Sequence, residues 1–218
     1  MKTHFCLRKS ILATALLTTT GFVFLALRIG HTGKSFYTFL LWNLFLAIIP
    51  LIPAYLFRKT IQHGFSWTLL VLFFAWLFLF PNAPYILTDF VHLHSREQVP
   101  IWYDASLLFF FTLAGMFSGI LSLHWIHKGL DKIGYTWLSW LIVFSTIVLS
   151  GYGIFLGRVL RLNSWDVIVR TEKVITLSLQ HLSDPVAISM TITFSLVIAS
   201  VYSVFKIIRS SSHETFLS

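Results

Sequence analysis

Charged residues are scarce in this sequence. Asp, Glu, Lys and Arg make up 11% of its 218 residues, whereas hydrophobic residues make up 56%. Soluble domains carry about 25% charged residues, and a chain with far fewer cannot cover a surface that faces water on every side. The scarcity of charge therefore excludes an ordinary soluble domain and indicates that part of the surface faces lipid.

Cysteine is almost absent as well, since Cys6 is the only one. A single cysteine excludes an internal disulfide, and no long apolar stretch precedes Cys6, which excludes processing as a lipoprotein. The chain also lacks the continuous basic face with interleaved aromatic residues that nucleic-acid binding requires. Its net charge of +8 comes from basic residues scattered between apolar segments, a pattern typical of loops that contact anionic lipid headgroups.

Long apolar stretches are what the chain has in abundance. A helix needs about 20 mainly apolar residues to cross the hydrocarbon core of a bilayer. Six stretches meet or approach this length without a Lys, Arg, Asp or Glu: 11–27, 36–57, 67–87, 105–125, 137–156 and 185–205. They are apolar on all sides, which favours helices over strands. We predict an all-α fold, a polytopic membrane helix bundle of about six transmembrane helices that forms a single domain over residues 1–218.

The first stretch follows Lys2, Arg8 and Lys9, an arrangement shared with signal peptides. It is long for a signal peptide, and Arg28 follows without a small-x-small cleavage site, so we expect a retained helix. Lys and Arg in the loops set the orientation of a membrane protein. With the N-terminus inside, nine of them fall inside and seven outside. We predict that both termini are cytoplasmic.

The interior of the predicted bundle holds almost no ionisable side chain. Asn43 is its main strongly polar residue, and a single Asn in a span is typical of hydrogen bonding between helices. Carriers coupled to protons or ions need ionisable groups near the midplane. Their absence from the predicted spans argues against ordinary secondary transport.

Polar residues gather instead at the expected outer ends of the third, fourth and fifth spans. Pro81 lacks a donor for the helical hydrogen bond, so we expect a kink or break there, with Asn82 bonding the freed backbone groups. If helix resumes at Pro84, one face carries Thr88, Asp89, His92 and Arg96. The fourth span follows Asp104. If the fifth helix continues past its apolar stretch, Arg158, Arg161 and Trp165 share a face, with Asn163 and Asp166 beside them.

Three interpretations of this outer surface stay open. Carboxylates and imidazoles suit a divalent metal such as zinc, and the candidate ligands are Asp89, His92, His94 and Asp104. Arg158 and Arg161 suit an anionic headgroup or a polyprenyl phosphate, because guanidinium groups bind phosphate through two parallel hydrogen bonds. In the third interpretation the arginines pair with Asp89 or Asp104 and only tie the helix ends together.

The segment between the fifth and sixth spans is too long for a plain connector. Apolar residues recur in it at helical spacing: Val167, Ile168, Val174, Ile175, Leu179 and Leu182. This pattern predicts an amphipathic interfacial helix, which either lies on the outer leaflet or covers the mouth of the bundle. At the opposite side, His124 and His127 lie three apart, and we interpret them as interfacial histidines.

Several runs resemble a known family. They are Asn43–Ala47 with Ile49–Leu51, Phe80–Tyr85 with Thr88, Asp89 and His92, Trp102–Asp104, and Gly157–Arg158 with Arg161 and Asn163–Asp166. Together they resemble the bacterial membrane-protein family called domain of unknown function 1361, from the second helix to the loop before the sixth. The resemblance implies a multi-pass protein of the bacterial cytoplasmic membrane and supplies no activity.

The leading hypothesis from the sequence is an outer-face polar site that binds or processes an anionic lipid or envelope precursor. Asp89, His92 and Asp104 are the candidate catalytic residues, with the histidine or a carboxylate as general base. The candidate substrate-binding residues are Arg158, Arg161, Asn163 and Asp166. Two alternatives remain: a small transporter or flippase, and a scaffold or assembly partner without chemistry. Whether the protein is an enzyme stays open.

Overall fold

A computed structural model describes residues 2–64, 66–95 and 98–214, and the side chains of residues 9–64, 66–95 and 98–209. The elements that these residues form are all helices. Six stretches of them are long and apolar enough to cross a membrane: Lys9–Thr32, Phe39–His63, Trp67–His92, Ile101–Ile133, Thr136–Arg158 and Pro185–Arg209. The predicted all-α bundle with six spans is confirmed. Its spans exceed the apolar stretches because the helices continue into the flanking polar residues.

Four of the spans are single helices, and two are interrupted. The single helices are α1 (Lys2–Thr32), α6 (Ile101–Ile133), α7 (Thr136–Arg158) and α10 (Pro185–Glu214). The second span consists of α2 (Phe39–Ile48), α3 (Leu51–Thr60) and the 3₁₀ turn η1 (Ile61–His63). The third consists of α4 (Trp67–Leu79), α5 (Asn82–Tyr85) and the 3₁₀ helix η2 (Ile86–His92).

Proline accounts for the breaks in both interrupted spans. Because Pro81 has no backbone N–H, the regular ladder of α4 ends at Leu79, and the predicted break is confirmed. The side-chain amide of Asn82 donates to the Leu79 carbonyl at 2.9 Å, as expected for a residue that satisfies freed backbone groups. The second break, at Pro50, differs from the single unbroken span expected over 36–57.

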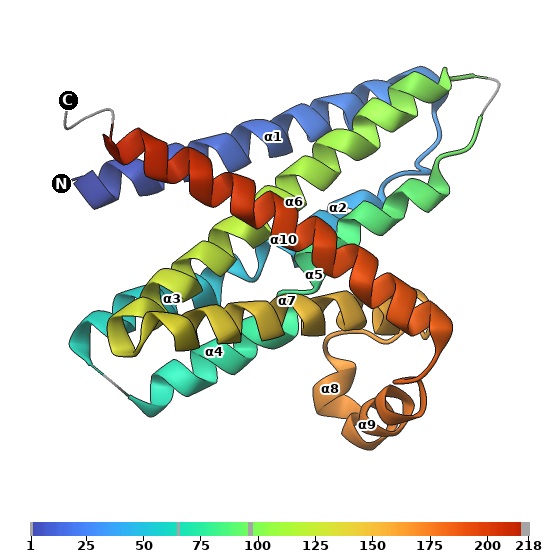
Figure 1. Cartoon of the computed structure of the whole chain (residues 1–218). Coiled ribbons are helices and arrows are strands. Elements are labelled where there is room, and N and C mark those ends of the chain that lie inside the picture. Colours follow the sequence, from blue (N-terminus) through green and yellow to red (C-terminus); the bar gives the residue numbers. More distant parts are fainter. Residues whose placement is uncertain (1, 65, 96–97, 215–218) are drawn as a thin grey trace.

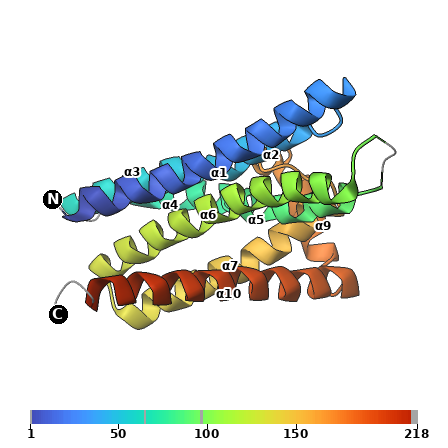
Figure 2. The same ribbon diagram turned by 90° about the horizontal axis from the view of Figure 1, so that it is seen from above.

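Helix α6 occupies the centre of the bundle (Figures 1 and 2) and packs against α1, α2, α3, α5, η2 and α7. Two of its glycines let the broken third span approach closely. A Cβ at Gly119 would lie 2.7 Å from the Cβ of Ala83, and one at Gly115 would lie 2.8 Å from Ile86 Cγ2. These small residues let α5 and η2, which carries Asp89, pack closely against α6.

Both termini lie at the same end of the molecule (Figure 2). We call the opposite end the distal end; there α1 and η2 finish, α6 begins and α7 finishes. The short helices α8 (Asp166–Val169) and α9 (Thr171–Gln180) also lie there. They confirm that the segment between the fifth and sixth spans is helical. The distal end is therefore where the polar residues singled out in the sequence meet.

Candidate functional site

Asp89 is the centre of one polar cluster at the distal end. Its side chain is 1% exposed, and its Oδ2 accepts a hydrogen bond of 2.7 Å from the amide of Asn43 in α2. Arg158, the last residue of α7, places Nη1 3.7 Å from Asp89 Oδ1. Three spans thus contribute to what we call the Asp89 cluster, formed by Asn43, Asp89, His92 and Arg158. The expected convergence of Asp89 and Arg158 is found in the structure, and Asn43 links helices as predicted.

His92 joins this cluster through Arg158, whose Nη2 lies 3.3 Å from His92 Nε2. A guanidinium group only donates hydrogen bonds. In this contact Nε2 of His92 is therefore the unprotonated nitrogen, and Nδ1 carries the proton. The 3₁₀ winding of η2, with three residues per turn, brings His92 onto the same side as Asp89. Because Nε2 faces Arg158, it is occupied in this arrangement and does not serve as a free base.

Asp104 lies in a different arrangement from the one expected. Both of its oxygens accept hydrogen bonds from Arg28 at the end of α1, from Nε at 2.6 Å and from Nη2 at 3.1 Å. The ring of Tyr37 covers the Arg28 guanidinium, with 4.6 Å between its centroid and Cζ. The partner of Asp104 is thus Arg28, rather than Arg158 or Arg161, and both oxygens of the buried carboxylate are engaged by it.

The helix of the fifth span ends at Arg158, so the condition under which Arg158, Arg161 and Trp165 would share a helix face is not met. Arg161 has φ of 55°, and the chain turns back there. Asp166 then closes a local turn, because its Oδ2 accepts from the Asn163 backbone N–H at 2.7 Å. Asp166 is buried and Asn163 is exposed. Asp166 therefore shapes the segment before α8 rather than facing an open site.

Asn82 and Ser164 hold this returning segment against the break in the third span. The Asn82 amide donates to Ser164 Oγ at 2.9 Å, and the distance from Ser164 Oγ to Asn82 Oδ1 is 3.2 Å. In a separate contact, the hydroxyl of Tyr152 in α7 donates a hydrogen bond to the backbone carbonyl of Ser178 in α9. The sequence reasoning identified none of these contacts across the fold, although Asn82 itself was singled out.

A cavity of about 740 Å³ lies between α2, the α4–α5 break, α7 and the segment from Arg161 through α9. We call it the distal cavity. Its apolar lining comprises Trp42, Leu46, Leu77, Phe78, Pro81, Leu149, Gly153, Leu156, Gly157, Leu162, Trp165, Val167, Val174 and Leu182. Its polar lining comprises Asn43, Asn82, Tyr85, Tyr152, Arg161, Asn163, Ser164 and Ser178. Several lining side chains are also exposed outward, among them Trp42, Phe78 and Leu149 at 53%, 49% and 55%.

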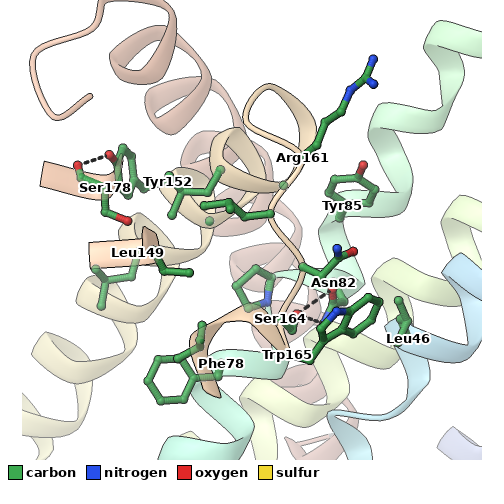
Figure 3. A pocket seen from close by; sticks show the side chains of 18 of the residues that line it. Leu46, Phe78, Asn82, Tyr85, Leu149, Tyr152, Arg161, Ser164, Trp165 and Ser178 are labelled. Carbon is green, nitrogen blue, oxygen red and sulfur yellow. Dashed lines mark hydrogen bonds between the residues drawn. The ribbon is translucent and has the colours of Figure 1, made fainter. Parts of the chain in front are cut away.

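Figure 3 shows that polar and apolar side chains are interleaved around this cavity. Tyr152 and Ser178 lie in the same part as Leu149, whereas Asn82 and Ser164 lie in the same part as Trp165, and the Arg161 side chain is directed away from the other labelled side chains. Among the lining residues that the structure describes, Arg161 alone is charged. Asn43 lines the cavity and bonds Asp89, so it joins the cavity wall to the Asp89 cluster. Of the predicted substrate-binding residues, Arg161 and Asn163 line the cavity directly.

The amphipathic segment contributes to the cavity wall through α9. Val174 and Ser178 of α9 line the cavity, while Ile175 and Leu179 are 54% and 64% exposed. One side of α9 thus covers the distal cavity, and another side presents apolar residues outward.

No three His, Cys, Asp or Glu side chains in the described parts of the chain are placed to hold a metal ion. His94 is exposed, and Asp104 is bound by Arg28. Arg96, expected beside Asp89, lies outside the described residues. Among the described residues, the distal end therefore places Arg161 and several neutral hydrogen-bonding groups around a largely apolar cavity.

Near the termini, His124 and His127 are both buried. His127 Nδ1 lies 2.6 Å from the Tyr202 hydroxyl, and its Nε2 lies 3.7 Å from Asp131. These contacts join α6 to α10. The sequence predicts that the two histidines lie at the membrane interface. The contact between His127 and Tyr202, which are 75 residues apart, has no signal in the local sequence.

Comparison with known proteins agrees with the resemblance noted in the sequence. A family model described as "Protein of unknown function (DUF1361)" matches residues 42–201. That range includes the Asp89 cluster and every described residue that lines the distal cavity, but not Arg28. No curated protein and no solved structure matches the chain.

Proposed function

This chain belongs to the DUF1361 family, and from that premise and the geometry of its distal end we propose that it binds an anionic lipid or a lipid-linked envelope precursor in the distal cavity. One observation carries the proposal: a largely apolar cavity among membrane-spanning helices has a single charged side chain, Arg161, among its described lining residues. The apolar lining suits hydrocarbon chains, and the guanidinium group suits a phosphate.

The backbone at Arg161 supports a binding role for its side chain. A non-glycine residue with φ of 55° is in the left-handed region, which glycine adopts without steric cost and other residues adopt at a cost of roughly 1 kcal/mol. Stability alone does not favour an exposed arginine in this backbone conformation. Strained residues of this kind cluster at functional sites.

The Asp89 cluster has a supporting role in this proposal. Arg158 is already engaged by Asp89 and His92, and Asp89 holds Asn43 in the cavity wall. We assign these residues to positioning the wall, and we assign headgroup contact to Arg161 and Asn163. Asp104 contributes only to the joint between α1 and α6.

We further propose that the protein lies in the cytoplasmic membrane of a bacterium with both termini inside. This orientation rests on the distribution of Lys and Arg between the loops. It puts the distal cavity at the outer leaflet, where anionic phospholipids and envelope precursors are accessible to it.

The test uses the purified full chain and three variants in nanodiscs of zwitterionic lipid, titrated with an anionic phospholipid. R161N removes the charge and keeps a side chain that tolerates positive φ, whereas R161K keeps the charge. R170N removes another exposed arginine at the same end that does not line the cavity. We expect R161N to weaken binding about fivefold to tenfold, equivalent to about 1–1.4 kcal/mol. R161K should weaken binding less than R161N, because lysine keeps the charge but cannot make two parallel hydrogen bonds, and R170N should bind within about twofold of the unmodified chain. Equal binding by R161N and R170N would refute the proposal.

A flippase is the second candidate, favoured by the two proline-interrupted spans. Discontinuous helices border the substrate sites of many transporters, and Pro81 at the α4–α5 break lines the cavity. Liposomes that contain a fluorescent anionic lipid, quenched from outside by dithionite, separate the two candidates. Accelerated loss of inner-leaflet fluorescence that R161N abolishes indicates a flippase. Binding without accelerated exchange indicates a lipid-binding protein.

A further inference from the structure

The charges around the distal cavity bear on which anionic lipid it takes. Resting on the proposed function above, we propose that the ligand is a singly charged phosphodiester lipid with an uncharged headgroup, rather than a phosphomonoester, a diphosphate or a zwitterionic lipid.

Among the described residues, Arg161 is the only cation that lines the cavity. Arg158 is engaged with Asp89 at 3.7 Å and with His92 at 3.3 Å. Arg28 does not line the cavity and is paired with Asp104 through two hydrogen bonds. Arg170 and Lys173 on the following segment are exposed and do not line the cavity, and Glu172 lies between them in the chain.

One cation matches one negative charge. A phosphomonoester carries about −1.5 to −2 at pH 7, and a diphosphate carries more, so either would leave negative charge uncompensated beside an apolar lining. Removing an unpaired charge from water is costly. A phosphodiester carries a single charge, which Arg161 can meet with two parallel hydrogen bonds.

The carboxylates near the cavity are not placed to pair with a cationic headgroup. No carboxylate is among the described residues that line it. Asp89 is buried behind Asn43 and faces Arg158, and Asp166 is buried and accepts from the Asn163 backbone. The ammonium group of a zwitterionic lipid would therefore find no carboxylate among the described lining residues, and only neutral acceptors. The neutral groups that remain, including the Tyr85 hydroxyl in the cavity lining, can hydrogen-bond an uncharged hydroxylated headgroup.

The experiment compares three lipids with identical acyl chains. Phosphatidylglycerol is a phosphodiester with an uncharged headgroup, phosphatidic acid is a phosphomonoester, and phosphatidylethanolamine is zwitterionic. Each is titrated in brominated form against the full chain and against R161N, with the quenching of tryptophan fluorescence as the signal. Trp42 and Trp165 line the cavity, and a W42F/W165F variant identifies the part of the signal that comes from it.

We expect phosphatidylglycerol to bind at least about fivefold more tightly than the other two, equivalent to about 1 kcal/mol, and R161N to remove that preference. If phosphatidic acid binds as well as phosphatidylglycerol or better, and R161N weakens both, the charge-matching inference is wrong while the proposed function stands. If phosphatidylethanolamine equals phosphatidylglycerol and R161N changes neither, both proposals fail. Quenching that W42F/W165F leaves unchanged places the lipid outside the cavity and overturns both as well.

Discussion

Arg28 and Asp104 form a buried two-point ion pair between the end of α1 and the beginning of α6. Nε and Nη2 of the arginine lie 2.6 and 3.1 Å from the two carboxylate oxygens, and the side chains are 3% and 1% exposed. The Tyr103 hydroxyl donates to the Phe24 carbonyl one turn away. Since α1 packs mainly on α6, these contacts fix how the first helix joins the bundle.

Breaking one side of this pair leaves an unpaired buried charge. We expect R28L and D104L each to lower the free energy of unfolding by about 3–5 kcal/mol, and the double variant R28L/D104L to lose much less, because no charge is then left unpaired. Unfolding in mixed micelles measures these values. K34Q, a change at an exposed residue of the same end, is the control and should leave stability unchanged. A double variant as unstable as either single variant would contradict the electrostatic explanation.

The limits of sequence reasoning are clear from these same residues. The spans follow from apolar length, and the break at Pro81 follows from a missing donor, so both were predictable. Asp89 and His92 lie three apart, and this local spacing lets both contact Arg158. Arg28 and Asp104 are separated by 76 residues, and hydrophobicity places Arg28 simply as a flanking charge. The local sequence does not indicate which arginine pairs with an aspartate when several arginines lie at one end of a bundle.

The distal cavity was beyond sequence reasoning for a related reason. It exists because the chain reverses at Arg161 and Ser164 bonds Asn82, 82 residues away. From the sequence, a helix that continues past Arg158 is a reasonable expectation, because no glycine occupies position 161, where the chain reverses. Gly157 precedes the reversal and does not mark its position. The side-chain types of the site were found, but the cavity that they border depends on long-range contacts.

Arg158 and Asp89 contribute unequally to stability, because Asp89 is 1% exposed and Arg158 is 22% exposed. Losing Arg158 leaves a buried carboxylate with only the Asn43 hydrogen bond, whereas losing the Asp89 charge leaves an arginine that reaches solvent. We expect R158Q to destabilise by about 1–3 kcal/mol and D89N by less. Unfolding in mixed micelles tests the order. If D89N destabilises the protein more than R158Q does, the argument from charge is wrong. The introduced amide at position 89 then cannot be accommodated beside Asn43.

The contact between α7 and α10 depends on the absence of a side chain at Gly151. A Cβ there would lie 2.6 Å from the Thr191 carbonyl oxygen and 2.8 Å from Ser195 Oγ. We expect G151A to destabilise by about 1–3 kcal/mol, because the backbone of α10 must move away. Gly30 in α1 has no atom near its Cβ position, so G30A is the matched control and should be neutral or stabilising by up to about 1 kcal/mol. Equal effects of the two changes would contradict this packing argument.

The proposed orientation can be checked with single cysteines in a C6S background. Lys173 is exposed on α9 at the distal end, and Lys128 is 61% exposed near the opposite end of α6. If both termini are inside, a membrane-impermeant maleimide added to intact cells labels K173C, and it labels K128C only after the membrane is permeabilised. The reverse pattern would place the distal cavity at the inner leaflet, where Arg161 would meet lipids of the cytoplasmic side. Labelling of both positions in intact cells would indicate two orientations in the same membrane, which the near balance of nine and seven basic residues would then explain.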